Sequence, residues 1–554
     1  MSPAIFSCSL VLRARWRWLA SGSTQTQLAG PPRKMMVIGP ITKLLAGLLV
    51  LPLLIMPARG ASSRPPNIVV ILADDLGYGD VRCYNAQSKI PTPHLDRLAA
   101  EGMRFTDAHA PDAVCTPTRY GLLTGRYAFR SRLKSGVLPP WGGALIEDGR
   151  FTVPALLRQR GYTTACIGKW HLGWDWPTKD NLPAASEDGI GNADFTKTIA
   201  NGPTTRGFDY YFGVDLPNFP PYCFIENDRT VGLPSLAAPL QKGAFNRPGP
   251  MVSGWSLTNI LPEITRRAAR YVEDTAKSSK PFFLYFSLTA PHYPVVPTDE
   301  FKGRSQAGDY GDFVAQVDGA VGEVLSALAR AGKTANTLVI FTSDNGPECV
   351  EVDPGAYDRI RRYGHRSMDG LRGVKRDIWE GGHRVPFLAR WPGHIPAGTT
   401  NAETICLVDL MATCAALTGA KVPLNAGEDS YNILPALLGK KGERPIREAT
   451  VLRGGRGDFA IRQGDWVLID AVSGDGNRGR NRPGEPEWFQ QERGYVTNQF
   501  SSELYNLRED LSQRQNLYGV KHDVVRRLKT VLEDYKTRGR STPGPQMKST
   551  PATE

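Results

Sequence analysis

Short runs of apolar residues alternate with helical patterns through most of the chain. Four runs are continuously apolar, as in parallel strands buried on both faces: residues 67–73, 163–167, 282–288 and 337–342. Four stretches between them carry apolar residues at helical spacing: residues 92–102, 154–160, 263–275 and 313–331. Because strands alternate with helices, the pattern predicts an α/β fold with a large, mostly parallel central sheet flanked by helices.

This pattern weakens in two other parts of the chain. Residues 176–260 are rich in Pro and Gly, and we expect insertion loops around a functional site there. After about residue 440 the pattern favours short antiparallel strands followed by one helix: residues 448–452, 459–462, 466–470, 503–507 and 521–535. The expected organisation is a main α/β domain, a smaller C-terminal α+β domain and a flexible tail: residues 61–440, 441–540 and 541–554.

The first 60 residues have the layout of a leader. Residues 44–56 are almost entirely apolar, Lys43 precedes them, and small residues follow. This is typical of a secretory signal peptide, and the stretch is too short to span a bilayer easily. We therefore expect an exported protein, periplasmic or extracellular, without a stable membrane anchor. Met35 or Met36 is a candidate for the true start.

Charge and cysteine content narrow the class of protein further. The formal charge is +12, but residues 1–60 hold seven basic residues and no acidic ones. Outside this leader the two signs nearly balance, so we expect no nucleic-acid partner. Seven cysteines follow the leader, and because seven is odd, at least one is expected to be unpaired.

Polar residues follow the carboxyl end of each predicted strand. In chain order these are Asp74, Asp75, Lys169, His171, His292, Asp344 and Asn345. Open α/β sheets bind ligands outside the carboxyl ends of their strands. A single polar residue in a loop would carry no meaning, but four strand ends of this kind predict a functional site along one edge of the sheet.

Four of these residues offer only oxygen ligands: Asp74, Asp75, Asp344 and Asn345. Hard cations such as Ca²⁺ and Mg²⁺ prefer oxygen, whereas Zn²⁺ prefers His or Cys. Three carboxylates at one edge would repel one another unless a cation held them. The sequence therefore predicts a divalent cation of the Ca²⁺ or Mg²⁺ kind.

A second candidate centre is the segment Cys115-Thr116-Pro117-Thr118-Arg119, which is predicted to open a helix. Cys115 would then lie at a helix N-terminus, where the backbone N–H groups favour an anion and would stabilise a thiolate. Arg119 lies one turn further on and faces the same side. A free buried cysteine is the simpler interpretation of Cys115 alone, but the combination favours a nucleophile or an anion site.

Six motifs in the same order resemble the type I sulfatases, the formylglycine-dependent members of the alkaline phosphatase superfamily. One motif is the signature made of CTPTR from Cys115 together with LTGR from Leu123. The other five are PNIVVILADDLGYGD from Pro66, GKWHLG from Gly168, APHYP from Ala290, SDNG from Ser343 and LRGVKRDIWEGGHRVP from Leu371. The resemblance covers roughly residues 65–540. Arylsulfatases and N-acetylgalactosamine-6-sulfatases are the most similar members.

This resemblance implies an activity, a modification and a set of roles. A separate formylglycine-generating enzyme would oxidise Cys115 to formylglycine, and Asp74, Asp75, Asp344 and Asn345 would hold Ca²⁺ together with residue 115. Arg119 would bind the formylglycine and the metal-site carboxylates. Four residues would surround the sulfate: Lys169, His171, His292 and Lys375. One departure is that Val374 and Arg376 flank Lys375 where many members have Gly.

The implied mechanism begins with the hydrated aldehyde, of which one hydroxyl attacks sulfur. Arg119, Lys169 and Lys375 would balance the charge on the sulfuryl oxygens, and His292 would protonate the leaving group. His171 would then accept a proton from the second hydroxyl as sulfate leaves. A plain Cys or Ser offers no such internal exit for sulfate.

The insertion also suggests a substrate. Aromatic and polar residues mix over residues 218–224 and 226–229, which suits a sugar ring with its hydroxyls, although an ordinary surface loop is an equal alternative. We expect a sulfated glycan, with aryl sulfates accepted as model substrates, and Glu226 and Arg229 as specificity residues.

Three other functions stay open at this point: a phosphonate or phosphate-ester hydrolase of the same superfamily, a non-catalytic binder of sulfated glycans if Cys115 stays unmodified, and a Cys–His hydrolase. For the remaining six histidines we expect structural roles, with His109 and His365 as possible members of the pocket.

Overall fold

The computed structural model describes residues 64–186, 189–241, 245, 247–479 and 484–547. Ser63–Glu554 forms one compact unit and is described here by itself. The expected leader lies outside the described residues and stays a prediction. Among the residues described, no helix is both long enough and apolar enough to cross a membrane.

The central sheet has ten strands and is mostly parallel. Its middle is β1 (Asn67–Asp74), which pairs in parallel with β10 (Phe282–Pro291) on one side and β11 (Thr337–Ser343) on the other. Beyond β10 follow β4 (Thr163–Lys169) and β5 (Tyr210–Val214), also in parallel. The antiparallel strands lie toward the two ends of the order β13-β2-β12-β11-β1-β10-β4-β5-β6-β7, in which the outer strands are β13 (Thr399–Asn401), β2 (Met103–Phe105), β12 (Phe387–Arg390), β6 (Ile225–Glu226) and β7 (Arg229–Thr230).

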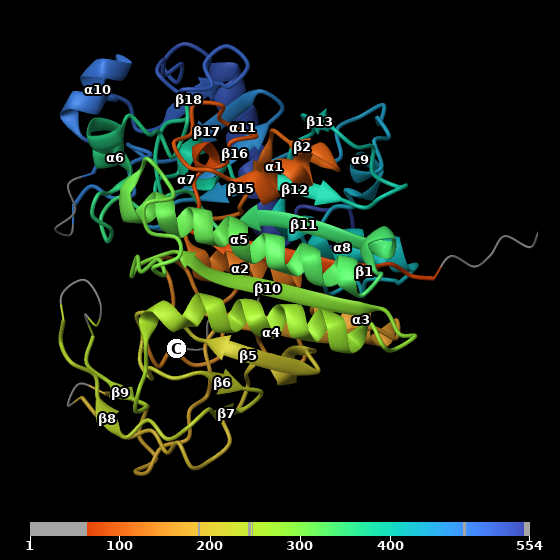
Figure 1. Ribbon diagram of the computed structural model, residues 1–554. Coiled ribbons are helices and arrows are strands. Elements are labelled where there is room, and N and C mark those ends of the chain that lie inside the picture. Colours follow the sequence, from red (N-terminus) through yellow and green to blue (C-terminus); the bar gives the residue numbers. More distant parts are fainter. Residues whose placement is uncertain (1–63, 187–188, 242–244, 246, 480–483, 548–554) are drawn as a thin grey trace, which may run out of the picture. The chain divides into compact units, whose positions relative to one another are not determined.

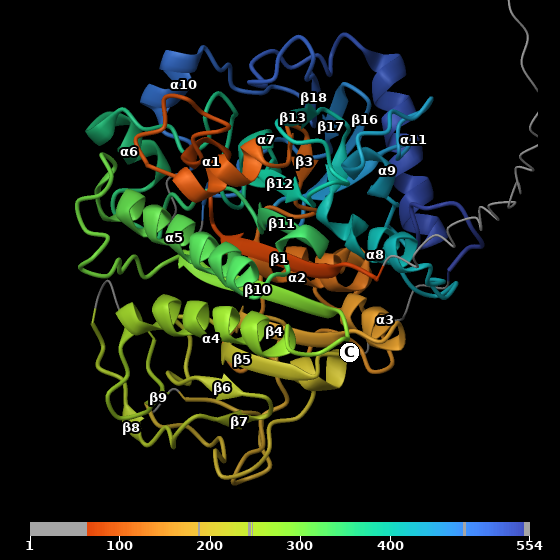
Figure 2. The same ribbon diagram turned by 45° about the vertical axis from the view of Figure 1, so that its right-hand side comes forward.

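Successive residues of β1 point into two separate cores. Val69 and Ile71 face a core shared with α1 (Pro93–Ala100), α4 (Ile260–Thr275) and α5 (Gly308–Arg330). Ile68 and Val70 face a core shared with α2 (Cys115–Thr124), α3 (Val153–Gln159) and α8 (Leu410–Thr418). Figures 1 and 2 show α4 and α5 side by side on one face of the strands. A strand that is buried on both faces needs this continuous apolar run.

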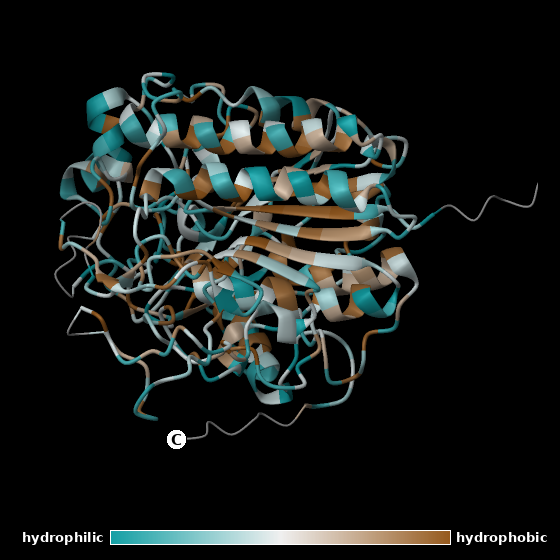
Figure 3. Ribbon diagram, turned by 60° about the horizontal axis from the view of Figure 1, so that its bottom comes forward, coloured by the Kyte–Doolittle hydropathy of each residue, from teal (hydrophilic) through white to brown (hydrophobic). Residues whose placement is uncertain are grey.

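Figure 3 shows the same division by hydropathy, with apolar strands between helices whose outer residues are polar. Local sequence signals fix the helix ends. The Thr152 hydroxyl accepts a hydrogen bond from Ala155 N at the start of α3, and Pro154 occupies the first turn. α2 ends at Gly125, whose φ of 64° is a left-handed conformation that favours glycine.

The C-terminal part forms a four-stranded antiparallel sheet of β15 (Thr450–Arg453), β16 (Phe459–Gln463), β17 (Trp466–Ile469) and β18 (Glu503–Asn506). Helix α11 (His522–Arg538) packs on it through Leu528 and Leu532, which share a core with Val451 and Leu468. The predicted fold class, a mostly parallel α/β sheet with a smaller α+β part, is confirmed.

The remaining elements are short. They are β3 (Ala108–His109), β8 (Leu236–Ala237), β9 (Pro250–Met251), β14 (Ile405–Cys406), α6 (Ala356–Tyr363), α7 (Glu380–His383), α9 (Leu434–Leu437) and α10 (Glu487–Arg493).

Two segments differ from the sequence expectation. Residues 176–260 are not loops alone, because β5 joins the central sheet and the β6–β7 hairpin extends its edge. The five apolar-rich residues of β5 were hidden by Pro- and Gly-rich neighbours. At the other end, Ser541 and Thr542 are buried and hydrogen-bonded to Asp429 and Glu428, so ordered structure enters the segment expected to be a flexible tail.

Candidate active site

The carboxyl ends of the central parallel strands bring the predicted polar residues together. Asp74 ends β1 and Lys169 ends β4, and the Lys169 Nζ atom lies 2.7 and 2.9 Å from the two Asp74 carboxylate oxygens. A Cβ at Gly168 would lie 1.8 Å from the Ser287 carbonyl oxygen, so this close approach of β4 to β10 requires glycine. The strand register therefore sets the Lys169–Asp74 pair.

Helix α2 places Cys115 and Arg119 at the same edge. Arg119 is fully buried and donates from Nε and Nη2 to Asp344 Oδ2 at 3.0 and 2.7 Å. Its Nη2 also lies 3.5 Å from Asp74 Oδ1, and Nη1 donates to the Ser287 hydroxyl. The guanidinium thus ties together the ends of β1, β10 and β11 beneath Cys115.

A second cationic group closes the cluster from a distant segment. Lys375 Nζ lies 2.7 Å from Asp75 Oδ2 and 3.3 Å from Glu348 Oε2. Asn345 Nδ2 donates to Asp75 Oδ1 at 2.8 Å, and His292 Nε2 lies 3.9 Å from Asp75 Oδ2. The structure therefore gathers all the residues expected around the metal and the sulfate from strand ends, α2 and the segment before α7.

Three non-glycine residues in or next to this cluster have left-handed backbone conformations. The φ angles are 65° for Asp75, 51° for His171 and 80° for Arg376. Such conformations are strained for residues with a Cβ and persist where the surroundings enforce them. Asp75 and His171 turn the chain just after the ends of β1 and β4, and Arg376 turns it just after Lys375. These turns direct the functional side chains toward the cluster.

The acidic residues form a candidate cation site whose donor atoms suit Ca²⁺. Ligand atoms of Asp74, Cys115 and Asp344 lie within 4.8 Å of one another, and all three residues are buried. Burial and the neighbouring Asp74 carboxylate raise the pKa of Asp344 to about 6. The Asn345 Oδ1 atom is buried and has no hydrogen-bond partner, which leaves an oxygen lone pair available. Carboxylate and amide oxygens are the donors that Ca²⁺ prefers.

Cys115 is not activated as a thiol. Burial raises its pKa to about 11, although Lys169 and Lys375 act in the opposite direction. The expectation that the helix start would stabilise a thiolate is wrong for the unmodified side chain, because desolvation outweighs the nearby positive charges. Burial therefore disfavours a thiolate nucleophile at position 115.

The two histidines present opposite nitrogens to the cluster. The His171 Nε2 atom lies 3.2 Å from the Leu138 carbonyl oxygen, which can only accept, so Nδ1 carries the lone pair; that Nδ1 is buried without a partner. In His292, Nδ1 donates to the Tyr293 carbonyl oxygen at 2.6 Å, so Nε2 carries the lone pair. Burial and Lys169 lower the pKa of both rings, that of His292 to about 4.

The predicted specificity residues have other partners in this structure. Glu226 accepts hydrogen bonds from the Tyr210 hydroxyl at 2.7 Å and from Arg267 at 3.0 Å. Arg229 is exposed and donates to Thr196 and Thr198. The described contacts do not join either residue to the catalytic cluster. A role for them in specificity stays a prediction.

Other residues of the site were not found from the sequence. Glu348 accepts two 2.7 Å hydrogen bonds from Arg376 beside Lys375, and Asp215 accepts from His171 N at 3.1 Å. Asp215 directly follows β5, so it obeys the same strand-end rule. It was missed because β5 was not predicted as a strand within the Pro- and Gly-rich insertion. Phe219, by contrast, lies in the segment 218–224 that the sequence had indicated; it contacts His171 edge to face with ring centroids 5.8 Å apart, and the Arg247 guanidinium lies 3.9 Å from the Phe219 ring.

The structure also shows the contacts of His109 and His365, the two possible pocket histidines, and the state of the cysteines. His365 is buried and lies 2.7 Å from Asp80, and His109 is buried against His383, so their contacts lie outside the cluster described above. The seven cysteines after the leader are all free, which agrees with the expectation that at least one is unpaired.

The carboxyl edge of this parallel α/β sheet gathers buried acidic and basic side chains around the start of α2, an arrangement suited to binding an anionic ester together with a cation. The chain matches the Sulfatase family model over residues 66–420. The chain belongs to the sulfatase family and is a sulfuric ester hydrolase.

Relatives of this family cover most of the chain. An N-acetylgalactosamine-6-O-sulfatase of Bacteroides thetaiotaomicron is 34% identical over 518 residues, which is 87% of this chain and 95% of the relative. Human arylsulfatase A is 36% identical over 437 residues, 75% of this chain and 76% of the relative. A sulfatase structure from work on glycosaminoglycan metabolism by Bacteroides thetaiotaomicron has a TM-score of 0.73 at 32% identity and covers 86% of this chain and 100% of its own.

Proposed function

We propose that the protein hydrolyses sulfate esters of sulfated glycans and accepts aryl sulfates as model substrates, with formylglycine at residue 115 and one Ca²⁺ ion. The observation that carries this proposal is the convergence of Arg119, Lys169 and Lys375 with the acidic residues around Cys115. Three cations at one buried point suit a sulfate group, whose charge needs compensation in the transition state.

Two groups would complete the site. Formylglycine, formed from Cys115 by a formylglycine-generating enzyme, supplies a hydrated aldehyde whose hydroxyl serves as nucleophile and whose second hydroxyl allows sulfate to leave. Ca²⁺ supplies positive charge at the sulfate oxygens. The residues that would hold the ion are Asp74, Asp75, Asp344, Asn345 and residue 115.

The protein's own residues then have two kinds of role, stabilisation of negative charge and transfer of protons. Arg119 fixes Asp344 and Asp74, and Lys169 and Lys375 offer positive charge to the sulfate oxygens. His171 presents an unpartnered Nδ1 that can accept a proton, and His292 presents its Nε2 for the transfer of a proton to the leaving oxygen. A bound sulfate would favour the protonated form of His292 because it adds negative charge nearby.

The glycan substrate is supported by the names of the relatives and by the surroundings of His171. The bacterial relative is named for N-acetylgalactosamine-6-sulfate, and this sugar is our first candidate. Phe219 and Arg247 form an aromatic and cationic border beside His171. The Arg247 Nη1 atom is buried without a hydrogen-bond partner, so it is available to a polar group of the substrate.

The test is turnover by purified protein that was produced together with a formylglycine-generating enzyme. We expect release of inorganic sulfate from N-acetylgalactosamine 6-sulfate and from a model aryl sulfate, and much slower turnover of the matching phosphate monoester and phosphonate ester. Faster turnover of the phosphorus esters would instead identify a phosphate or phosphonate hydrolase. Tight binding of a sulfated glycan without turnover of any ester would identify a binder.

A further inference from the structure

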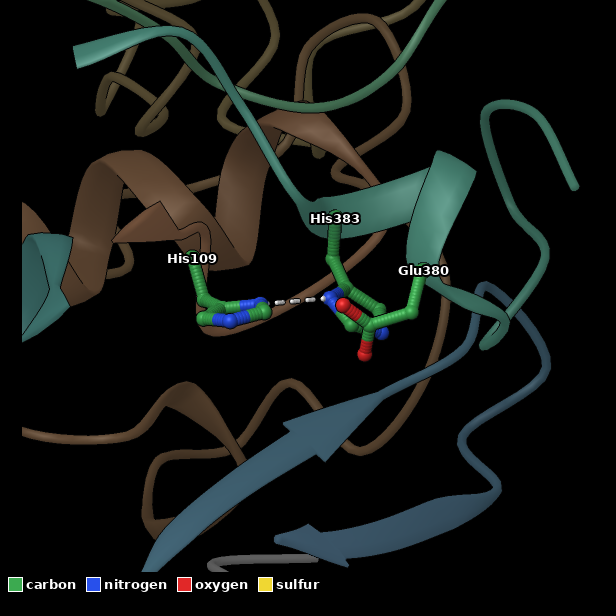
Figure 4. Close-up of side chains that lie close together, drawn as sticks. All are labelled: His109, Glu380 and His383. Atoms are coloured by element: carbon green, nitrogen blue, oxygen red, sulfur yellow. Dashed lines mark hydrogen bonds between the residues drawn. The ribbon is translucent and has the colours of Figure 1, made fainter. Parts of the chain in front are cut away.

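A second cluster of metal-ligating side chains lies apart from the catalytic groups. His109 ends β3, and Glu380 and His383 are the first and last residues of α7. All three are buried, and one ligand atom from each lies within 4.8 Å of the others (Figure 4). We propose that these three residues bind one transition-metal ion of the Zn²⁺ class, which holds together the segments that carry Cys115 and Lys375.

The outer nitrogen of each histidine already has the partner that a metal ligand needs. The His383 Nε2 atom lies 3.0 Å from the Ile378 carbonyl oxygen, so it carries the proton and Nδ1 carries a lone pair. The His109 Nε2 atom lies 2.9 Å from Asp107 Oδ1. Metal-bound histidines usually donate their second ring N–H to a carboxylate or a backbone carbonyl. Ile378 offers the carbonyl to His383 and Asp107 offers the carboxylate to His109, while Arg462 Nη1, which can only donate, also lies 2.9 Å from His109 Nε2.

The inner nitrogens and one carboxylate oxygen face the same point. The two Nδ1 atoms of His109 and His383 lie 3.1 Å apart. Two nitrogens at about 2.0–2.1 Å from one Zn²⁺ ion would have a similar separation at a bond angle near tetrahedral. The Glu380 Oε1 atom is buried without a hydrogen-bond partner, while Oε2 accepts from Arg384 Nε at 2.6 Å. Oε1 is therefore the third ligand.

A direct hydrogen bond between the two rings is the alternative. It requires a proton on His109 Nδ1, because His383 Nδ1 is the acceptor. In a neutral His109 the bare Nε2 atom then accepts from Arg462 Nη1 at 2.9 Å, but it also lies 2.9 Å from the Asp107 carboxylate oxygen, which cannot donate. This arrangement also leaves Glu380 Oε1 buried without a partner, which is costly for a carboxylate.

Ligand type and charge select the ion. Two imidazole nitrogens and one carboxylate oxygen suit Zn²⁺, Co²⁺ or Ni²⁺ and not Ca²⁺ or Mg²⁺. Arg384 and Arg462 balance the charges of Asp107 and Glu380. A fourth, anionic ligand such as hydroxide would therefore reduce the charge that a divalent ion adds.

One further feature concerns the surroundings of the site. A pocket of about 1040 Å³ is lined by Asp107 and Arg462, which contact His109 directly, so this pocket lies next to the cluster.

The position of the site gives it a structural role. His109 precedes Cys115 by one short segment, and Glu380 follows Lys375 by another. The Arg376 backbone N–H donates to the Ala113 carbonyl oxygen at 2.8 Å, which already joins the two segments. An ion between β3 and α7 would reinforce this link behind the catalytic residues. This inference does not depend on the proposed substrate or on formylglycine.

The experiment measures binding of Zn²⁺ and Co²⁺ to the full chain with Cys115→Ala and excess Ca²⁺, so that the catalytic groups do not compete. We expect one equivalent of Zn²⁺ to remain after desalting, visible absorption bands of four-coordinate Co²⁺, and a rise in Tm of about 2–4 °C at saturating Zn²⁺. His383→Gln keeps a donor for Ile378 and His109→Gln keeps a group for Asp107, but each removes the inner nitrogen. Each should lose the bound equivalent and the Tm shift.

The matched control is His394→Gln, which removes an exposed histidine that stacks on Trp391. It should retain the metal equivalent, the Co²⁺ bands and the Tm shift. The proposal is overturned if the parent binds no Zn²⁺ under these conditions, or if it binds the same amount as His383→Gln and His109→Gln. If a Gln variant does not fold, the test rests on the parent protein with Cys115→Ala. In that protein, a missing Co²⁺ spectrum or a Tm that does not respond to Zn²⁺ would contradict the site.

Discussion

Replacing Lys375 by Met removes the cation that lies closest to Asp75 while keeping a side chain of similar length. Asp75 is buried, and the Lys375 Nζ atom lies 2.7 Å from its Oδ2. Burial alone would raise the pKa of Asp75, but Lys375 and His292 hold it below its ordinary value. Glu348, the second partner, keeps its two 2.7 Å hydrogen bonds from Arg376. The variant therefore leaves one uncompensated carboxylate.

Leaving one buried charge without its partner costs about 3–5 kcal/mol of the free energy of unfolding. For a folded unit of roughly 490 residues the unfolding entropy near Tm is about 1 kcal/mol per degree, so we expect a fall in Tm of about 3–5 °C without metal. Ca²⁺ bound through Asp75 would replace the lost positive charge. The fall in Tm should then be less than half as large in saturating Ca²⁺.

The assay is thermal unfolding of both proteins with excess chelator and with excess Ca²⁺, followed by hydrolysis of a model aryl sulfate. Turnover should fall by about 10²–10³-fold, because a group that stabilises transition-state charge is lost. The control is Lys302→Met, whose ion pair with Asp299 is largely exposed and therefore adds little to stability. The same Tm loss for Lys375→Met with and without Ca²⁺ would refute the placement of the ion beside Asp75.

The other predictions concern the ion, the C-terminal contacts and the substrate. Exhaustive chelation should abolish sulfate release and Ca²⁺ should restore it better than Zn²⁺; full activity after chelation would contradict the oxygen-ligand site. Burial raises the pKa of Asp429 but the Arg130 guanidinium at 2.8 Å outweighs it, so this pKa is lowered and its stabilising contribution is lost as pH falls. Arg130→Met should therefore lower the Tm more at pH 7 than at pH 3.5, and a difference in Tm that does not change with pH would refute this. Changing Glu226 and Arg229 to Ala should reduce kcat/KM for the glycan more than for the aryl sulfate, and equal effects would remove both from specificity.

The strand-end rule accounts for what could be predicted from the sequence. Asp74, Lys169, His292 and Asp344 each follow a short apolar run, and parallel pairing around β1 brings the ends of those runs to one edge. No tertiary information is needed for that inference, because the parallel direction of the strands follows from the α/β pattern. For the same reason the fold class could be predicted before the structure was known.

The rest depends on contacts between segments that are far apart in the chain. Lys375 and Asp75 are 300 residues apart, and no local pattern shows that Glu348 would join them. The position of Cys115 at a helix start was visible, but its burial was not, and burial decides its pKa. The partners of Glu226 likewise follow from packing of the β6–β7 hairpin against α4.

The most direct test of the account is the chemical state of residue 115 in active protein. Peptide mass spectrometry should show this residue lighter than cysteine, as an aldehyde that hydrazine reagents trap, and the fraction modified should scale with sulfate release. Cys115→Ala should fold, retain Ca²⁺ and lose turnover, because it removes the nucleophile without opening a large cavity. Fully active protein with an unmodified thiol at position 115 would contradict the proposed mechanism.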